Sequence, residues 1–324
     1  MKRHWLWPFT PLYRLGLAVR ERKFRPGSRS IQRLQWPVVS IGNLSTGGSG
    51  KTPLTIALAK ALTAHGLHVD VLSRGYGRRS AFPLPVDPNG TAEDFGDEPL
   101  EIARAAGVPV YIAAERYQAG LLAEAAASAG VHILDDGFQH RQLARDVDIL
   151  LLSRTDLDDR LLPIGNLREA LGAAARADVI AIPAEENGAP VKSLGSDAKI
   201  WRLHRRMDIP TIDGPVAAFC GIARPQQFFL GLEAAGLRVA ARLAFGDHHR
   251  YSTDDARRIE REARSVGATA ILTTEKDHVR LGALAAAFKP SLPLRTVPLR
   301  IEIENEDAAV NWLIDRIKRA QPQS

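Results

Sequence analysis

The sequence has a single cysteine, no internal repeat and no long apolar segment. Cys220 stands alone among 324 residues, so no disulfide can form within the chain, as is usual in a reducing, cytoplasmic compartment. Cys220 lies in an apolar run, which favours a small core residue over a reactive thiol. No apolar run approaches the roughly 18–20 residues that a membrane-spanning helix needs. We therefore expect a soluble globular protein that folds without disulfides.

The net positive charge is concentrated at the N-terminus. The net charge is +6, yet residues 1–35 contain nine Lys or Arg side chains and one acidic side chain, Glu21. The rest of the chain is therefore close to neutral. Because no basic patch recurs in it, we do not expect nucleic-acid binding.

Residues 1–30 combine this charge with apolar side chains. Leu12, Leu15 and Val19 share one face of a possible helix, and the arginines lie elsewhere on it. The aromatic side chains around its start are Trp5, Trp7, Phe9 and Tyr13. A basic amphipathic segment of this kind is typical of the surface of an anionic membrane. The alternatives are a solvated basic arm and a helix packed on the protein's own core.

Residues 31–195 alternate between short apolar runs and helical stretches rich in Ala and Leu. This alternation predicts an α/β fold with a mostly parallel sheet flanked by helices. The predicted strands are Val38–Ile41, Val69–Leu72, Val131–Leu134, Val147–Leu152 and Val179–Ile182. The predicted helices are Pro53–His65, Pro99–Ala106 and Arg116–Ala129.

Residues 196–324 predict a second, smaller α/β domain. The boundary lies near the Gly-, Asn- and Pro-containing stretch 185–195, to within about ten residues. The last predicted strand could also return to the first domain. The predicted strands are Lys199–Leu203, Val216–Phe219, Val239–Phe245, Ala270–Thr274 and Leu294–Ile303, and the helices are Pro225–Ala235, Thr253–Ser265 and Glu306–Arg319.

A glycine-rich loop joins the first predicted strand to the first predicted helix. It consists of Ser45, Thr46, Gly47, Gly48, Ser49, Gly50, Lys51 and Thr52. In such a Walker A loop the backbone N–H groups and the helix N-terminus bind phosphates, as in P-loop NTPases. Lys51 is expected to reach the β- and γ-phosphates during catalysis, and the Thr52 hydroxyl to ligate Mg²⁺. Ser45 departs from the strict pattern, which has glycine there.

A carboxylate is needed near the loop to hold Mg²⁺. Asp135 and Asp136 follow the apolar strand at 131–134 and so resemble a Walker B motif. Which of them lies nearer the metal stays open, and a simple turn is the alternative. The base-reading GTPase pattern [N/T]-K-x-D is missing, because the nearest stretch, 274–277, has the wrong spacing. We therefore expect ATP as the nucleotide.

The loop alone does not distinguish a kinase from an ATPase switch. A kinase also needs a group that takes the proton of the acceptor hydroxyl. Asp97 is a candidate, although an Asp before a Pro at a helix start is also an ordinary cap. Arg74 follows the second strand, at the sheet edge where ligands bind. For Arg74 and for Arg168, which precedes a predicted helical stretch, a structural ion pair is the alternative.

Taken together, these segments resemble the tetraacyldisaccharide 4'-kinase family of the lipid A pathway. The matching strings, in order, are Gly42-Asn43, Gly47-Gly48-Ser49-Gly50-Lys51-Thr52-Pro53, Ser73-Arg74-Gly75-Tyr76-Gly77-Arg78, Gly96-Asp97-Glu98-Pro99, Asp135-Asp136-Gly137-Phe138-Gln139-His140, Leu162-Pro163 with Leu167-Arg168-Glu169, Phe245-Gly246-Asp247-His248 and Thr274-Glu275-Lys276-Asp277. The family also has Ser or Thr at the position of Ser45.

The resemblance implies transfer of the ATP γ-phosphate to the 4'-hydroxyl of a tetraacylated glucosamine disaccharide 1-phosphate, which gives lipid IVA. Asp97 then becomes the general base, with His248 as its partner across the domain interface. Asp135 and Asp136 become the carboxylates linked to Mg²⁺. The implied contacts to the lipid headgroup or its phosphate are Arg74, Tyr76, His140, Arg168 and Glu169.

The resemblance also implies a peripheral enzyme on the cytoplasmic face of the bacterial inner membrane. Its partners would be the lipid substrate and the membrane surface, and no obligate protein partner is evident. The alternative is a membrane-associated P-loop ATPase that acts as a switch without a small-molecule phosphoryl acceptor. Such a switch has no need of a pair between Asp97 and His248.

Overall fold

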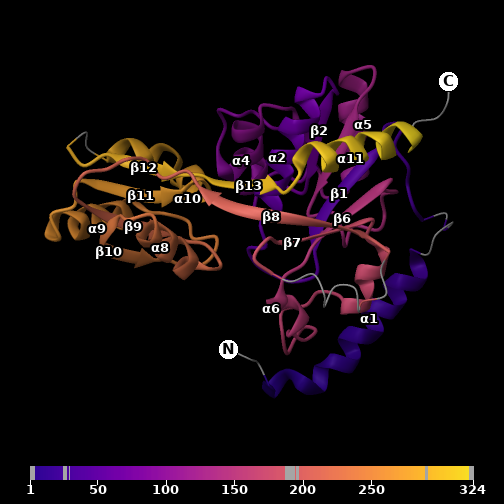
Figure 1. Cartoon of the computed structure of the whole chain (residues 1–324), viewed down its shortest axis with the longest axis horizontal. Helices are drawn as coiled ribbons and strands as arrows, with labels where there is room; N and C mark the ends of the chain where they lie inside the picture. Colours follow the sequence, from indigo (N-terminus) through magenta and orange to yellow (C-terminus); the bar gives the residue numbers. More distant parts are fainter. Residues whose placement is uncertain are drawn as a thin grey trace.

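A computed structural model shows two α/β units joined side by side (Figure 1). It describes residues 4–24, 28, 30–186, 194, 197–288 and 291–320. The larger unit is built on a nine-stranded sheet with the order β13-β8-β7-β6-β1-β5-β2-β4-β3, and the smaller on a four-stranded sheet with the order β10-β9-β11-β12. The predicted α/β fold is therefore confirmed.

The nine-stranded sheet is parallel from β4 to β8, and its two edge strands, β3 and β13, are antiparallel. Its strands are β1 (Val38–Asn43), β2 (Val69–Ser73), β3 (Leu84–Pro85), β4 (Val110–Ile112), β5 (Val131–Asp135), β6 (Val147–Leu151), β7 (Val179–Pro183), β8 (Lys199–Met207) and β13 (Leu299–Ile303). The central strands are buried along their whole length, which explains their continuous apolar sequences.

The larger unit also contains helices, among them the N-terminal one that the sequence suggested. They are η1 (His4–Phe9), α1 (Thr10–Lys23), α2 (Lys51–Ala64), α3 (Ala92–Phe95), α4 (Asp97–Ala106), α5 (Arg116–Ala126), α6 (Arg154–Leu157), η2 (Leu171–Arg176) and α11 (Glu306–Ala320). No described helix is both long and apolar enough to cross a membrane.

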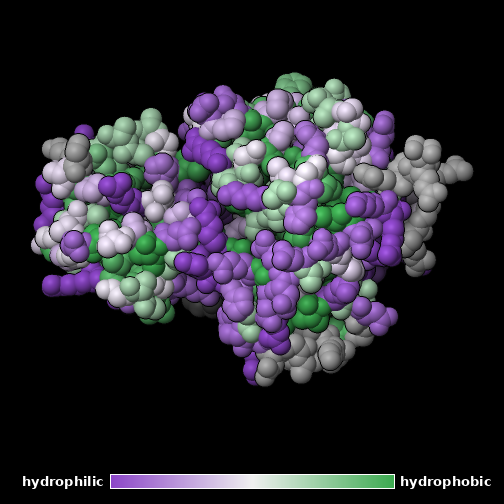
Figure 2. All heavy atoms as spheres, turned by 45° about the horizontal axis from the view of Figure 1, so that its top comes forward, coloured by the Kyte–Doolittle hydropathy of each residue, from purple (hydrophilic) through white to green (hydrophobic). Residues whose placement is uncertain are grey.

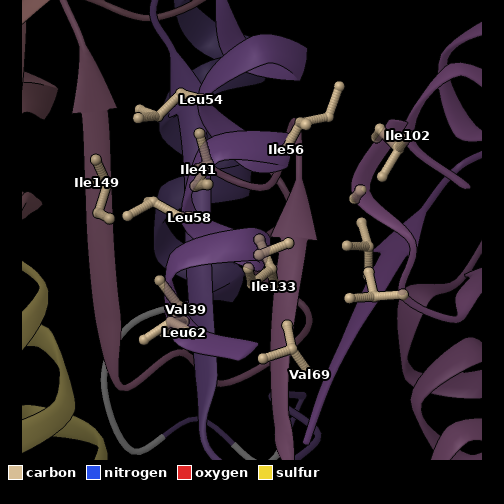
Figure 3. Packing of buried hydrophobic residues seen from close by; sticks show 14 of the residues in the cluster. Val39, Ile41, Leu54, Ile56, Leu58, Leu62, Val69, Ile102, Ile133 and Ile149 are labelled. Atoms are coloured by element: carbon tan, nitrogen blue, oxygen red, sulfur yellow. The ribbon is translucent and has the colours of Figure 1, made fainter. Parts of the chain in front are cut away.

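The core of the larger unit fixes the position of α2. Leu54, Leu58 and Leu62 are fully buried, and their spacing of four residues places them on one helix face. Figure 3 shows this face packed against β1 and β5, where Ile41 and Ile133 lie in the same cluster. The packing holds the first turn of α2 at the end of β1, which is where the glycine-rich loop is.

The smaller unit has its own parallel sheet and apolar core. Its elements are β9 (Pro215–Cys220), α8 (Pro225–Ala234), β10 (Arg238–Ala244), α9 (Thr253–Ser265), β11 (Ala270–Thr274), α10 (Glu275–Leu281), η3 (Gly282–Ala287) and β12 (Leu294–Val297). Cys220 is fully buried, and burial raises the pKa of its thiol to about 12, as suits a core residue.

Two strands that the sequence assigned to residues 196–324 pair within the larger sheet. β8 pairs with β7, and β13 pairs with β8. The predicted run Leu294–Ile303 is divided at Pro298 into β12 and β13, because proline has no N–H to donate to a sheet ladder. The return of the last strand, left open by the sequence, is thus observed. The expected boundary at 195 and 196 lies outside the described residues.

The two crossings of the chain between the units are therefore the segments after β8 and after β12. Figure 1 shows β8 running toward the smaller unit and β13 running back beside it. α11 follows β13, and its apolar face, which includes Leu313 and Ile317, packs into the core of the larger unit. We propose that residues 208–298 form the smaller unit.

The packing of α2 yields a prediction about stability. Replacing Leu58 by Ala removes a fully buried side chain and should lower the free energy of unfolding by about 2–5 kcal/mol. The control is Leu121→Ala, because Leu121 lies on α5 with 40% of its surface exposed. This control should lower the free energy of unfolding by at most about 0.5 kcal/mol. Urea unfolding followed by circular dichroism measures both, and equal losses would contradict the assigned packing.

Candidate active site

The glycine-rich loop leaves β1 at Asn43 and enters α2 at Lys51. Gly47 and Gly50 have φ angles of 111° and 94°, in the left-handed region that favours glycine. Thr46, Gly47 and Gly48 are exposed, so this part of the loop is open to a ligand. The loop therefore has the backbone course and the helix N-terminus that a phosphate site needs.

Lys51 turns back toward the ends of β1 and β5. Its Nζ donates to Asn43 Oδ1 at 3.2 Å and lies 3.5 Å from Asp136 Oδ1. Its side chain is largely buried. Sequence reasoning gave Asn43 no role, although its place directly after a buried strand could have indicated one.

Asp135 and Asp136 have opposite electrostatic environments. Asp135 is buried at the end of β5, where its carboxylate accepts from Thr55 Oγ1 at 3.2 Å and from Ser73 Oγ at 3.3 Å. Burial, with a smaller contribution from Glu98, raises its pKa to about 7. Burial would also raise the pKa of Asp136, but Lys51 and then Arg168 hold it well below its usual range.

These groups form an oxygen donor set that suits Mg²⁺. Besides the two carboxylates it contains the buried hydroxyl residue Thr52, at the start of α2. In the part of the chain that the structure describes, no three His, Cys, Asp or Glu side chains group as a metal site. Mg²⁺ in kinases is held by one or two carboxylates together with substrate phosphates and water, so the set fits. The raised pKa of Asp135 shows a carboxylate that a cation would stabilise.

Arg168 holds the phosphate loop from the side. Its guanidinium donates to both carboxylate oxygens of Asp136 at 3.0 Å and also to Asn43 Oδ1. Its Nε donates to Ser45 O at 3.2 Å, and its backbone N–H donates to Leu44 O at 2.6 Å. The structure thus places this predicted substrate contact in an ion pair with Asp136, beside the phosphate site.

Glu169, the next predicted substrate contact, is buried and forms ion pairs. Its carboxylate lies 2.8 Å from Arg176 Nη2 and 4.0 Å from Arg20 Nη2 on α1. Tyr13, also on α1, donates from its hydroxyl to Arg168 O at 2.8 Å. The N-terminal helix is therefore attached to the segment that holds the phosphate loop.

The structure brings Asp97 and His248 together from different units. Asp97 begins α4, and His248 lies in the loop after β10 with a φ angle of 58°. His248 Nδ1 is 3.0 Å from Asp97 Oδ2. Burial would raise the pKa of Asp97, but His248 and Arg280 hold it well below its usual range. The hydrogen bond to Asp97 raises the pKa of His248.

Sequence reasoning missed the helix α10 and its two cations. Arg280 Nε and Nη2 donate to Asp97 Oδ2 at 2.8 and 2.5 Å, and Lys276 Nζ donates to Glu98 Oε1 at 2.5 Å. The signal was present in the sequence, since residues four apart lie on one face of a helix.

The remaining predicted substrate contacts lie around the loop after β2. Arg74 and Tyr76 line a shallow cleft with Arg78 and Arg79. The ring of Tyr76 approaches His248 edge to face, with 6.2 Å between centroids.

His140 is half-buried in the turn that follows Asp136. Burial, followed by the charges of Arg116 and Arg145, lowers the pKa of His140 to about 3. Sequence reasoning also missed Arg116, which is buried. Among the residues that the structure describes, its Nε has no hydrogen-bond partner. Burial lowers the pKa of Arg116 to about 10. The side of the site that includes Arg74 is therefore rich in positive charge.

The contrast between the two aspartates predicts opposite effects of their amides on the ligand-free protein. A raised pKa means that Asp135 contributes stability when protonated, which is lost as the pH rises from 3.8 toward about 7. Asp135→Asn should therefore raise the thermal unfolding temperature at pH 8 and change it little at pH 5.

Asp136→Asn is the matched variant and should lower that temperature at pH 8, because Lys51 and Arg168 lose their carboxylate partner. Thermal unfolding at pH 5 and 8 measures both variants. Equal shifts of one sign would contradict the assigned environments.

Known proteins resemble this chain along almost its whole length. The model of the family described as LpxK, tetraacyldisaccharide-1-P 4'-kinase, matches residues 2–318. A tetraacyldisaccharide 4'-kinase of Koribacter versatilis is 42% identical over 97% of this chain and 99% of its own length. One of Syntrophus aciditrophicus is 35% identical over 96% of this chain and 92% of its own length.

A solved structure is similar along the whole chain. It is LpxK from Aquifex aeolicus in complex with ATP, 33% identical, with a TM-score of 0.77 and coverage of 97% of this chain and 99% of that one. The family model, the relatives and the solved structure each cover almost the whole chain, and the chain belongs to the tetraacyldisaccharide-1-P 4'-kinase family.

Proposed function

We propose that this protein transfers the γ-phosphate of ATP to the 4'-hydroxyl of a tetraacyldisaccharide 1-phosphate, which gives lipid IVA. One observation carries the proposal: the pair of Asp97 and His248 joins the smaller unit to a phosphate-loop unit in a chain of this family. An ATPase switch without an acceptor gives no reason for such a pair, so the kinase is favoured.

The ATP half of the reaction belongs to the loop of residues 45–52. Its N–H groups and the start of α2 would surround the phosphates. The Lys51 ammonium would stabilise the negative charge on the β- and γ-phosphate oxygens during transfer. Thr52, Asp135 and Asp136 would hold Mg²⁺. When bound, the cation neutralises charge on the phosphate oxygens.

Asp97 is the proposed general base for the 4'-hydroxyl, with His248 as the group that orients it. Its Oδ1 accepts from Glu98 N at 3.0 Å, and its Oδ2 accepts from His248 and Arg280. A carboxylate held this way is a weak base. A weak base is sufficient for phosphoryl transfer, because the loose transition state requires mainly that the acceptor hydroxyl be oriented.

The headgroup of the acceptor would lie along the cationic side of the site. Arg74 and Tyr76 lie in the cleft after β2, and His140 lies near several arginines. The 1-phosphate of the acceptor is an anion that guanidinium groups bind well. Arg168 and Glu169 would act at its margin, through the segment that they fix beside the phosphate loop.

The membrane half of the proposal rests on α1. No residue of this helix is buried, which disfavours the alternative of a helix packed on the protein's own core. Leu12, Leu15 and Val19 are 69%, 62% and 60% exposed, and basic side chains fill its last turn. Such a helix can lie on an anionic bilayer, here the cytoplasmic face of the inner membrane, where a four-chain lipid would be found.

Removal of the proposed base should separate the kinase from the switch. Asp97→Asn should lower the turnover number by about 10²–10⁴-fold while ATP still binds, because Asp97 is not in the phosphate loop. Transfer of labelled phosphate to a detergent-solubilised acylated disaccharide phosphate measures it. The control is Asp94→Asn on the exposed helix α3. Near-normal transfer by Asp97→Asn would rule out the base assignment.

Replacement of the exposed apolar face of α1 should weaken membrane binding. A variant with Gln at Leu12, Leu15 and Val19 should sediment less with anionic vesicles and lose activity on acceptor presented in them, yet keep its activity in detergent. The control places Gln at Leu121 and Leu122, which are exposed on α5. Unchanged sedimentation and unchanged vesicle activity would contradict the assignment.

A further inference from the structure

Helix α10 of the smaller unit packs against α4, the helix that begins with Asp97. Two ion pairs cross this contact: Arg280 with Asp97, and Lys276 with Glu98. All four side chains are mostly buried, so each charge depends on its partner more than a surface pair would. Figure 2 shows hydrophilic residues gathered where the two units meet.

Arg280 is also held by contacts within its own unit. Its Nη1 donates to Gly221 O at 2.6 Å and lies 3.3 Å from Asp277 Oδ1. Asp277 is fully buried and accepts in turn from Gly221 N and from the hydroxyl of Tyr251, both at 2.9 Å. The guanidinium is thus held in one orientation, and only 5% of its side chain is exposed.

Three contacts converge on one oxygen atom. Asp97 Oδ2 receives Arg280 Nε and Nη2, and it lies 3.0 Å from His248 Nδ1. Arg280 Nη2 is itself 3.2 Å from that Nδ1. The other oxygen, Oδ1, accepts from Glu98 N at 3.0 Å. Arg280 is thus one of three residues whose hydrogen bonds hold the Asp97 carboxylate.

We propose that Arg280 is a positioning residue for the pair of Asp97 and His248, and that together with Lys276 it makes the alignment of Asp97 depend on docking of the smaller unit. This inference rests on the proposed function, in which Asp97 is the base. Arg280 itself would touch neither ATP nor the acceptor, and would act through Asp97.

The charge distribution on α4 supports this dependence. Its first five residues include three acidic side chains, Asp97, Glu98 and Glu101. Asp97 and Glu98 form ion pairs with Arg280 and Lys276 of the smaller unit. Burial raises the pKa of Glu101 to about 8. The charged and titratable groups that face Asp97 are Glu98 and Glu101 on its own helix, Asp247 and His248 after β10, and Lys276, Asp277 and Arg280 on α10. Without α10, the carboxylates of Asp97 and Glu98 would lose the cations that pair with them.

The test uses the full-length protein with Arg280→Gln, Arg280→Lys and the control Arg300→Gln. Arg300 pairs with Asp208 and approaches Glu275 on α10, but does not contact Asp97. Arg280→Gln should lower the turnover number at least about tenfold with little change in KM for ATP. Arg280→Lys should recover part of that loss, and Arg300→Gln should leave turnover unchanged. Normal turnover in Arg280→Gln would overturn the inference.

The double variant Asp97→Asn with Arg280→Gln tests whether Arg280 acts through Asp97. It should be no slower than Asp97→Asn alone, because groups that act as one unit are not additive. A double variant whose loss of turnover number equals the product of the two single losses would overturn the inference. If Asp97→Asn alone is fully active, the proposed base fails; if it is inactive while Arg280→Gln is normal, only the role of Arg280 fails.

The pH profile separates positioning from a general loss of structure. Loss of the guanidinium should raise the pKa of Asp97, so the acid limb of the turnover number should move to higher pH in Arg280→Gln and less in Arg280→Lys. Thermal unfolding confirms that each variant is folded, and Arg280→Lys, which keeps the charge, serves if Arg280→Gln does not fold. A reduced turnover number with an unmoved acid limb would overturn the inference.

Discussion

The contact of the Asp97 carboxylate with His248 and Arg280 is the interaction on which the arrangement of the candidate site depends. The carboxylate belongs to the larger unit by sequence, yet its strongest partners, His248 and Arg280, belong to the smaller one. Without those partners, burial would disfavour the charged form of the Asp97 carboxyl group, and the group would take up a proton. The two units therefore complete a site that neither one holds alone.

The topology explains why the partners can meet. In parallel sheets the loops after the strands gather at one edge, and ligands bind there. In the larger unit this edge carries the glycine-rich loop after β1 and the aspartates at the end of β5. In the smaller unit it carries Gly221, His248 and α10, which follow β9, β10 and β11. β8 and β13 join the units so that the two edges face each other across α4 and α10.

Much of the fold followed from local sequence patterns, and most of the failures were long-range. Buried strands such as β1 and β5 are continuous apolar runs, and glycine with lysine marks the loop, so both could be predicted. β3 and β4 have two and three residues, too few for a pattern. The place of β8 in the larger sheet depends on its pairing with β7. Arg280 lies 183 positions from Asp97, and no local rule connects them.

The attachment of α1 to the segment beside the phosphate loop has a kinetic consequence. Tyr13 and Arg20 connect this helix to Arg168 and Glu169. Under the proposed function, the phosphate loop would therefore keep a set height above a bilayer on which the helix rests. On a bilayer, enzyme and acceptor would then meet by lateral diffusion in two dimensions. The rate would follow the mole fraction of acceptor in the membrane, and added inert lipid would slow the reaction by dilution even at constant bulk concentration.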